Sequence, residues 1–128
     1  MPNYISNIVR MKGLRSLPLF STRAPEPGWP VKEFFDFDKI IPIPEMTDDW
    51  YWWRVSNWGT KWNSFNLTFL DDDTIKFNTA WNCPEPVIRK LSELYPYVEI
   101  EHWWADEDYG FNSGRAFHFL CKCQIGVR

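Results

Sequence analysis

Two runs of carboxylates are the residues of this chain best suited to acid–base or metal chemistry. They are Asp71, Asp72 and Asp73, and Asp106, Glu107 and Asp108. Paired carboxylates act as general acid and base or bind Mg²⁺, and either role would make the protein a small metal-dependent hydrolase. The alternative is two solvated loops, whose acidic surface would bind a basic groove of a partner by charge complementarity. No Ser-His-Asp pattern, phosphate-binding glycine loop or dinucleotide fingerprint accompanies them, so we expect no catalytic residues.

A zinc site is the second chemistry that the residue types suggest. The candidate ligands are His102, His118, Cys121 and Cys123. On a regular strand His118 points away from both cysteines, and the two cysteines are not spaced as a chelating pair. We therefore expect no metal and no cofactor, with reduced cysteines that fill the core.

Tryptophans are concentrated in residues 50–62, which hold five of the nine in the chain. Within this stretch, residues 57–63 place two tryptophans and a lysine around Gly59. One interpretation is structural: the helix ends here and its indole rings pack between helix and sheet. The other is a partner-binding surface, because Trp and a cation are well suited to recognition. Its residues would be Arg54, Asn57, Trp58, Lys61 and Trp62, together with Trp103.

Trp103 and Trp104 are adjacent, so on a strand their rings point to opposite faces of the sheet. An exposed Trp103 beside Tyr97 on the outer face would form a stacking platform for single-stranded nucleic acid. Glu99 and Glu101 share that face and would repel phosphates. Nucleic acid is therefore the alternative to a protein partner.

Composition limits the remaining classes. The 128 residues fit a single domain spanning 1–128, and an aromatic content of 19% predicts a core built from large rings. The net charge of −3 is too small to favour nucleic acid. No apolar run is long enough to span a bilayer and no secretion signal opens the chain, so we expect a cytoplasmic protein without membrane contact.

The elements of the first half are predicted from periodicity and breakers. A strand over 3–12 is followed by an irregular, proline-rich connection over 14–31 with at most one short helical turn, and then by an extended segment over 34–44. Asp48 or Asp49 caps a short helix at about 48–58, and Gly59 ends it.

The second half reads as a hairpin, a helix and closing strands. Residues 62–70 and 75–81 alternate around a turn at Asp71–Asp73, and a helix runs from Pro84 to Pro96. The hairpin places Phe65, Leu67 and Phe69 on one side of its first strand, and Ile75, Phe77, Thr79 and Trp81 on one side of its second. Strands follow at 98–104 and 115–125, and on the last one Phe117, Phe119, Cys121, Cys123 and Ile125 share a face.

This order predicts an α+β protein with a ferredoxin-like, split β-α-β-β-α-β arrangement. Both helices pack on one face of an antiparallel sheet, and the first helix is shortened or irregular. The other face of the sheet is left open.

Four blocks of sequence resemble the YubB-type ferredoxin-like domain family of phages and conjugative plasmids. They are Met1–Tyr4, Phe35–Pro44, Asn57–Asn63, and Thr79–Trp81 with Pro84–Ile88. The resemblance spans about residues 1–111 and implies a ferredoxin-like fold without an iron–sulfur cluster, and a mobile-element origin. It supplies no catalytic residues. The chain departs from the family pattern at Pro18–Pro30, where the family has a clearer first helix, and after Phe111.

Together these observations lead us to expect a non-enzymatic accessory protein of a phage or plasmid. It would bind a host protein in the bacterial cytoplasm and inhibit an antiviral defence complex such as a CRISPR effector. A single-stranded nucleic-acid-binding module is the alternative, and a small metal-dependent hydrolase is the third.

Overall fold

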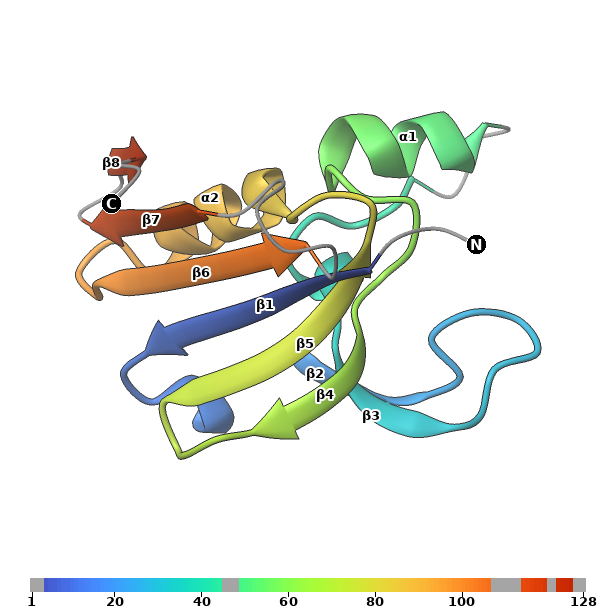
Figure 1. Cartoon of the computed structure of the whole chain (residues 1–128), viewed down its shortest axis with the longest axis horizontal. Coiled ribbons are helices and arrows are strands. Elements are labelled where there is room, and N and C mark those ends of the chain that lie inside the picture. Colours follow the sequence, from blue (N-terminus) through green and yellow to red (C-terminus); the bar gives the residue numbers. More distant parts are fainter. Residues whose placement is uncertain (1–3, 45–48, 107–113, 120–121, 126–128) are drawn as a thin grey trace.

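One antiparallel sheet organises the computed structural model, which describes residues 4–44, 49–106, 114–119 and 122–125. Its strands lie in the order β4-β5-β1-β6-β7-β8. Their bounds are β1 Tyr4–Met11, β4 Phe65–Phe69, β5 Thr74–Ala80, β6 Ile100–Asp106, β7 Gly114–Phe119 and β8 Lys122–Ile125. The two helices are α1 Trp50–Asn57 and α2 Glu85–Leu94; in Figure 1, α2 lies behind β6 and β7, and α1 lies above the sheet.

The chain order β1, α1, β4, β5, α2, β6 and the strand order β4-β5-β1-β6 together define a ferredoxin-like α+β fold. This confirms the predicted fold class. The first helix is short, as expected, with eight residues. It begins at Asp49, whose carboxylate accepts a hydrogen bond from the Trp52 backbone N–H at 3.2 Å. Strands β7 and β8 extend the sheet beyond β6.

The long connection between β1 and α1 is more ordered than its prolines predicted. It contains a short 3-10 turn, Leu14–Ser16, a two-stranded ribbon of β2 Phe20–Arg23 and β3 Lys32–Phe35, and a second 3-10 turn, Phe37–Lys39. The irregular connection predicted over 14–31 is thus corrected. Pro25, Pro27 and Pro30 all lie in the loop between β2 and β3, where they interrupt no ladder.

The core lies between the sheet and the elements behind it. Strands β1 and β5 contribute apolar residues at alternate positions, β6 contributes Ile100, and α2 contributes one stripe. The fully buried residues of the core include Val9, Met11, Phe35, Phe37, Trp58, Ile75, Phe77, Val87, Ile88, Leu91 and Ile100. Trp58, directly after α1, is the largest of these side chains.

The hairpin β4–β5 differs from the predicted alternation at both ends. Phe65 pairs with Asn78 and Phe69 pairs with Ile75, but the register shifts between them, so the two phenylalanines lie on opposite faces. Asn66 occupies the shift with a φ of 57°. Strand β5 ends at Ala80, so Trp81 does not continue its buried face.

The predicted single strand over 115–125 is also corrected. Strands β7 and β8 pair antiparallel, with Phe119 opposite Lys122, so alternation cannot run through both as one face. Residues 120 and 121, and with them Cys121, lie outside the described residues.

Among the described residues, neither α1 nor α2 nor any other helix has the length and apolar character needed to cross a membrane.

Candidate partner-binding surface

The block Asn57–Asn63 divides between the interior and the surface. Trp58 is only 1% exposed, and its indole Nε1 donates to the Ile41 carbonyl oxygen at 2.9 Å. Gly59 has a φ of 80°, and a Cβ there would lie 2.9 Å from Cδ of Pro86 in α2. Lys61 and Trp62, by contrast, are partly exposed.

Asn63 joins this block to the segment Phe35–Pro44. Its amide Nδ2 donates to Oδ1 of Asp36 at 2.8 Å, and its Oδ1 accepts from the backbone N–H groups of Phe37 and Ser64 at 2.9 and 2.8 Å. Asp36 in turn accepts from the Ser21 hydroxyl in β2 at 2.7 Å. The segments Phe35–Pro44 and Asn57–Asn63 therefore meet in one buried, hydrogen-bonded junction.

Arg54 and Trp58 do not lie on a surface. For Trp58 this favours the structural interpretation, an indole packed in the core, and it corrects the prediction that Arg54 contacts a partner directly. Arg54 is 8% exposed, and its Nη1 lies 2.6 Å from Oε1 of Glu26 in the β2–β3 loop. The guanidinium is also stacked over the Trp50 and Trp58 rings, at 4.2 and 5.4 Å from their centroids. The prediction failed because the buried carboxylate that neutralises Arg54 is 28 residues away in the sequence. Asn57 is partly exposed, and its amide donates to the Trp53 carbonyl oxygen at 2.9 Å.

The aromatic surface, as we call it, consists of Tyr51, Trp52, Lys61, Trp62 and Trp81. The Tyr51 ring meets Trp52 and Trp81 edge-on, at 5.5 and 6.5 Å between centroids. The Lys61 ammonium then bridges the rings of Trp81 and Trp62, 5.0 Å from each centroid. Trp52 is 62% exposed and Trp81 is 39% exposed. Large rings from α1, from the loop after it and from the end of β5 thus form one continuous row, exposed at Tyr51, Trp52 and Trp81 and partly exposed at Trp62.

The backbone at Trp81 is strained in a way that favours a role for its ring. Its φ is 71°, a value that bulky residues rarely adopt. The Asn82 N–H donates to the Ala80 carbonyl oxygen at 2.9 Å, which makes Trp81 the centre of a γ-turn. The Thr79 hydroxyl donates to the Asn82 carbonyl oxygen at 2.7 Å and holds the turn. The fold thus tolerates strain at a residue whose ring it leaves partly in solvent.

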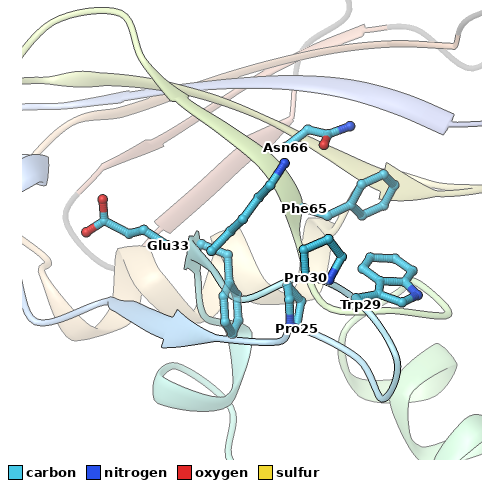
Figure 2. A pocket seen from close by; sticks show the side chains of 8 residues that line it. Pro25, Trp29, Pro30, Glu33, Phe65 and Asn66 are labelled. Carbon is cyan, nitrogen blue, oxygen red and sulfur yellow. The ribbon is translucent and has the colours of Figure 1, made fainter.

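An apolar pocket of about 180 Å³ adjoins the aromatic surface. The Trp29 ring meets the Trp62 ring edge-on at 5.1 Å and the Phe65 ring at 5.3 Å, so Trp29 and Phe65 belong to the pocket and also reach the row. Figure 2 shows the Trp29 and Phe65 rings beside Pro25 and Pro30, with Asn66 and Glu33 farther out. Its full lining is Pro25, Trp29, Pro30, Lys32, Glu33, Phe34, Phe65 and Asn66.

Trp103 lies on the outer face of the sheet, as predicted. Residues paired across two strands share a face, and the pair Val9 and His102 is buried in the core, so the next pair, Ile8 and Trp103, lies on the opposite face. It is partly buried. Tyr97 lies in the loop before β6 and is 85% exposed. Neither residue belongs to the aromatic surface.

The carboxylates of the first acidic run shape the β4–β5 turn. The Asp73 N–H donates to the Asp71 carboxylate at 2.8 Å, and this hydrogen bond lowers the pKa of Asp71. Asp73 accepts from the Gly13 N–H at 2.8 Å, and Asp72 forms an exposed ion pair with Arg15 at 3.8 Å. In the second run, Asp106 is the last residue of β6, while Glu107 and Asp108 lie outside the described residues.

His102 occupies a buried polar network in the core. Asn7 donates through Nδ2 to the Ile5 carbonyl oxygen and to Thr79 Oγ1, at 3.1 and 3.0 Å, so its Oδ1 must accept. The Nε2 atom of His102, 2.9 Å from that oxygen, therefore carries the proton. In the part of the chain that the structure describes, no group of three or more His, Cys, Asp or Glu side chains is placed to hold a metal ion.

Sequence reasoning missed Tyr51, Trp52, Trp81 and Trp29 as members of the site. The tryptophan density of 50–62 was the available signal, but it does not distinguish buried rings from exposed ones. The turn that exposes Trp81 has no sequence signature, because glycine or asparagine is the usual residue at positive φ.

The class of fold is also found by comparison with known proteins. Residues 57–118 match the model of a family described as the ferredoxin-like domain in Api92-like protein. The match covers slightly less than half of the chain, from the end of α1 into β7, and it supports a ferredoxin-like domain family. Searches of curated proteins and of solved structures found no match.

Proposed function

We propose that this protein is a non-enzymatic binding protein that holds a protein partner on its aromatic surface. The observation that carries the proposal is the row formed by the exposed rings of Tyr51, Trp52 and Trp81 and the partly exposed ring of Trp62, around Lys61. Tryptophan and tyrosine are the side chains that most often dominate binding energy at protein interfaces. Contiguous exposed apolar patches on a monomer commonly mark such interfaces.

The strain at Trp81 supports the same proposal. A φ of 71° at a bulky residue costs about 1–3 kcal/mol, and such strain concentrates at functional sites. Glycine would adopt the same turn without this cost. An exposed indole at this position is therefore better explained by recognition than by stability.

The biological setting that we propose rests on the resemblance to the YubB-type family in the four sequence blocks given above. It is an accessory protein of a phage or conjugative plasmid, acting in the bacterial cytoplasm. Its partner is a host protein, and inhibition of an antiviral defence complex, such as a CRISPR effector, is the activity that fits a small binding protein from a mobile element.

Affinity capture from phage-infected or plasmid-bearing cells tests this proposal. The native chain should retain a defined host protein, and Trp81→Gly should not, because it removes the ring but fits the turn. Tyr97→Ala is the control, since it removes an exposed ring outside the aromatic surface, 85% exposed against 39% for Trp81. Equal capture by all three chains, or by none, contradicts the proposal.

Binding of single-stranded nucleic acid is the second candidate, favoured by the partly exposed Trp103 on the outer sheet face. Titration with labelled oligonucleotides at low and high salt tests it. Binding that weakens with salt and depends on Trp103 and Tyr97 would support it. Absence of binding at every salt concentration would remove it.

A further inference from the structure

The charge of Lys61 is not neutralised within the described part of the chain. Its ammonium lies 5.0 Å from the ring centroids of both Trp62 and Trp81, and it forms no ion pair with a described carboxylate. Other cations near packed rings differ in this respect, since Arg15, Arg23 and Arg54 each contact a carboxylate. The aromatic surface therefore carries a positive centre framed by apolar rings.

A carboxylate from a partner is the group that complements this centre. When a partner covers the rings, water leaves the space around Lys61, and the attraction between ammonium and carboxylate strengthens as the local dielectric falls. A neutral or basic partner would instead bury the cation without a counter-charge, which is costly.

The pocket sets a second requirement for the partner, and the ring contacts limit how far the pocket wall lies from Lys61. The Lys61 ammonium is 5.0 Å from the Trp62 ring centroid, which is 5.1 Å from the Trp29 centroid in the pocket wall. Lys61 and Trp29 are thus at most about 10 Å apart, a span that an extended chain covers in about three residues. The pocket volume of about 180 Å³ is small for a drug-sized ligand and suits one large apolar side chain.

We propose that the partner presents a linear acidic segment to this surface. An Asp or Glu carboxylate of the segment meets Lys61 between Trp62 and Trp81, and an apolar side chain about three residues away enters the pocket beside Trp29 and Phe65. This inference rests on the proposed function and specifies the chemistry of its partner.

Selection from a library of random linear peptides tests the inference. The native chain is the bait, and peptides that also bind Trp81→Gly are discarded. The enriched sequences should share an acidic residue and a large apolar residue two to four positions apart. Enrichment of basic or uncharged sequences, or of none, overturns the inference.

Fluorescence anisotropy with an enriched peptide provides the quantitative measurement. Lys61→Ala should weaken binding about tenfold or more and Lys61→Glu further, whereas Lys61→Arg should stay within a few-fold of the native chain. Replacing the acidic residue of the peptide by its amide should weaken binding to the native chain but have little further effect on Lys61→Ala. Lys76→Ala, at an exposed lysine of β5, is the control and should leave binding unchanged.

The two proposals fail in different ways. If peptides bind through Trp81 and are indifferent to Lys61, the aromatic surface remains a binding site and only the acidic segment is wrong. If no peptide depends on Trp81 and the host protein captured from cells is equally insensitive, the binding site itself is wrong.

Discussion

Arg54 and Glu26 form a buried ion pair that fastens the β2–β3 loop to α1. Nη1 of Arg54 lies 2.6 Å from Oε1 of Glu26, and both side chains are nearly excluded from solvent. The guanidinium also lies over the rings of Trp50 and Trp58, so a single side chain connects the loop, the helix and the core. The loop carries Trp29, and the ion pair therefore positions the pocket relative to the aromatic surface.

Removal of one partner of this pair should destabilise the protein strongly. We expect Arg54→Ala to lower the free energy of unfolding by about 3–5 kcal/mol, because Glu26 would remain buried without a counter-charge. The double variant Arg54→Met with Glu26→Leu should lose less than the two single variants together. Urea denaturation measures both, and a loss below about 1 kcal/mol for Arg54→Ala would show that the pair is not buried as described.

Gly59→Ala should be more damaging than Gly28→Ala, although both glycines have positive φ, 80° and 85°. At Gly59 a Cβ would lie 2.9 Å from Pro86 Cδ and 3.3 Å from the Cys83 carbonyl oxygen, whereas at Gly28 nothing lies within 4 Å. We expect losses of about 2–4 kcal/mol at Gly59 and about 1–2 kcal/mol at Gly28. Thermal unfolding of the two variants compares them, and equal losses would mean that contact with α2 is not what requires glycine.

Asn63→Ala should cost more than Asn57→Ala within the same block. Asn63 makes three buried hydrogen bonds, to Asp36, Phe37 and Ser64, and its loss leaves buried groups unsatisfied, at about 2–4 kcal/mol. Asn57 makes one bond at the end of α1, worth about 1 kcal/mol. Chemical denaturation measures the difference, and the reverse order would refute the buried junction.

Cys83 should react slowly with alkylating reagents in the native protein. Burial raises the pKa of its thiol to about 11. Little thiolate is thus present at pH 8, and the rate should rise with pH toward 11. Because the pKa is higher in the folded state than its ordinary value of 9.0, this thiol lowers stability only as pH rises from about 9 to 11. Site-resolved mass spectrometry measures the rate, with the urea-denatured chain as the fast reference.

The parts of the fold that depend on local sequence, through apolar alternation or a capping residue, could be predicted. Asp49, the β4–β5 hairpin and the stripe of α2 were all predicted, and they define the ferredoxin-like arrangement. The β2–β3 ribbon was hidden because its loop holds Pro25, Pro27 and Pro30, which resemble a structureless connection. Strand β8 was hidden because apolar alternation continued through residues 120 and 121.

The site was only partly predictable. Lys61 and Trp62 were identified from residue type, and both are partly exposed in the structure. Arg54 was misplaced because its partner, Glu26, is distant in the sequence, and the choice between a buried and an exposed Trp58 depended on contacts with distant residues such as Ile41. Whether a ring in a tryptophan-rich stretch is buried depends on tertiary contacts, and these cannot be predicted from the local sequence pattern.

The most direct test of the aromatic surface is an NMR map of the indole N–H signals. The nine tryptophans give nine signals, which can be assigned by single substitutions. On addition of the captured host protein or an enriched peptide, we expect the signals of Trp52, Trp62, Trp81 and Trp29 to shift while that of the buried Trp58 stays in place. Shifts confined to Trp103, or no shift at Trp62 and Trp81, would contradict the account.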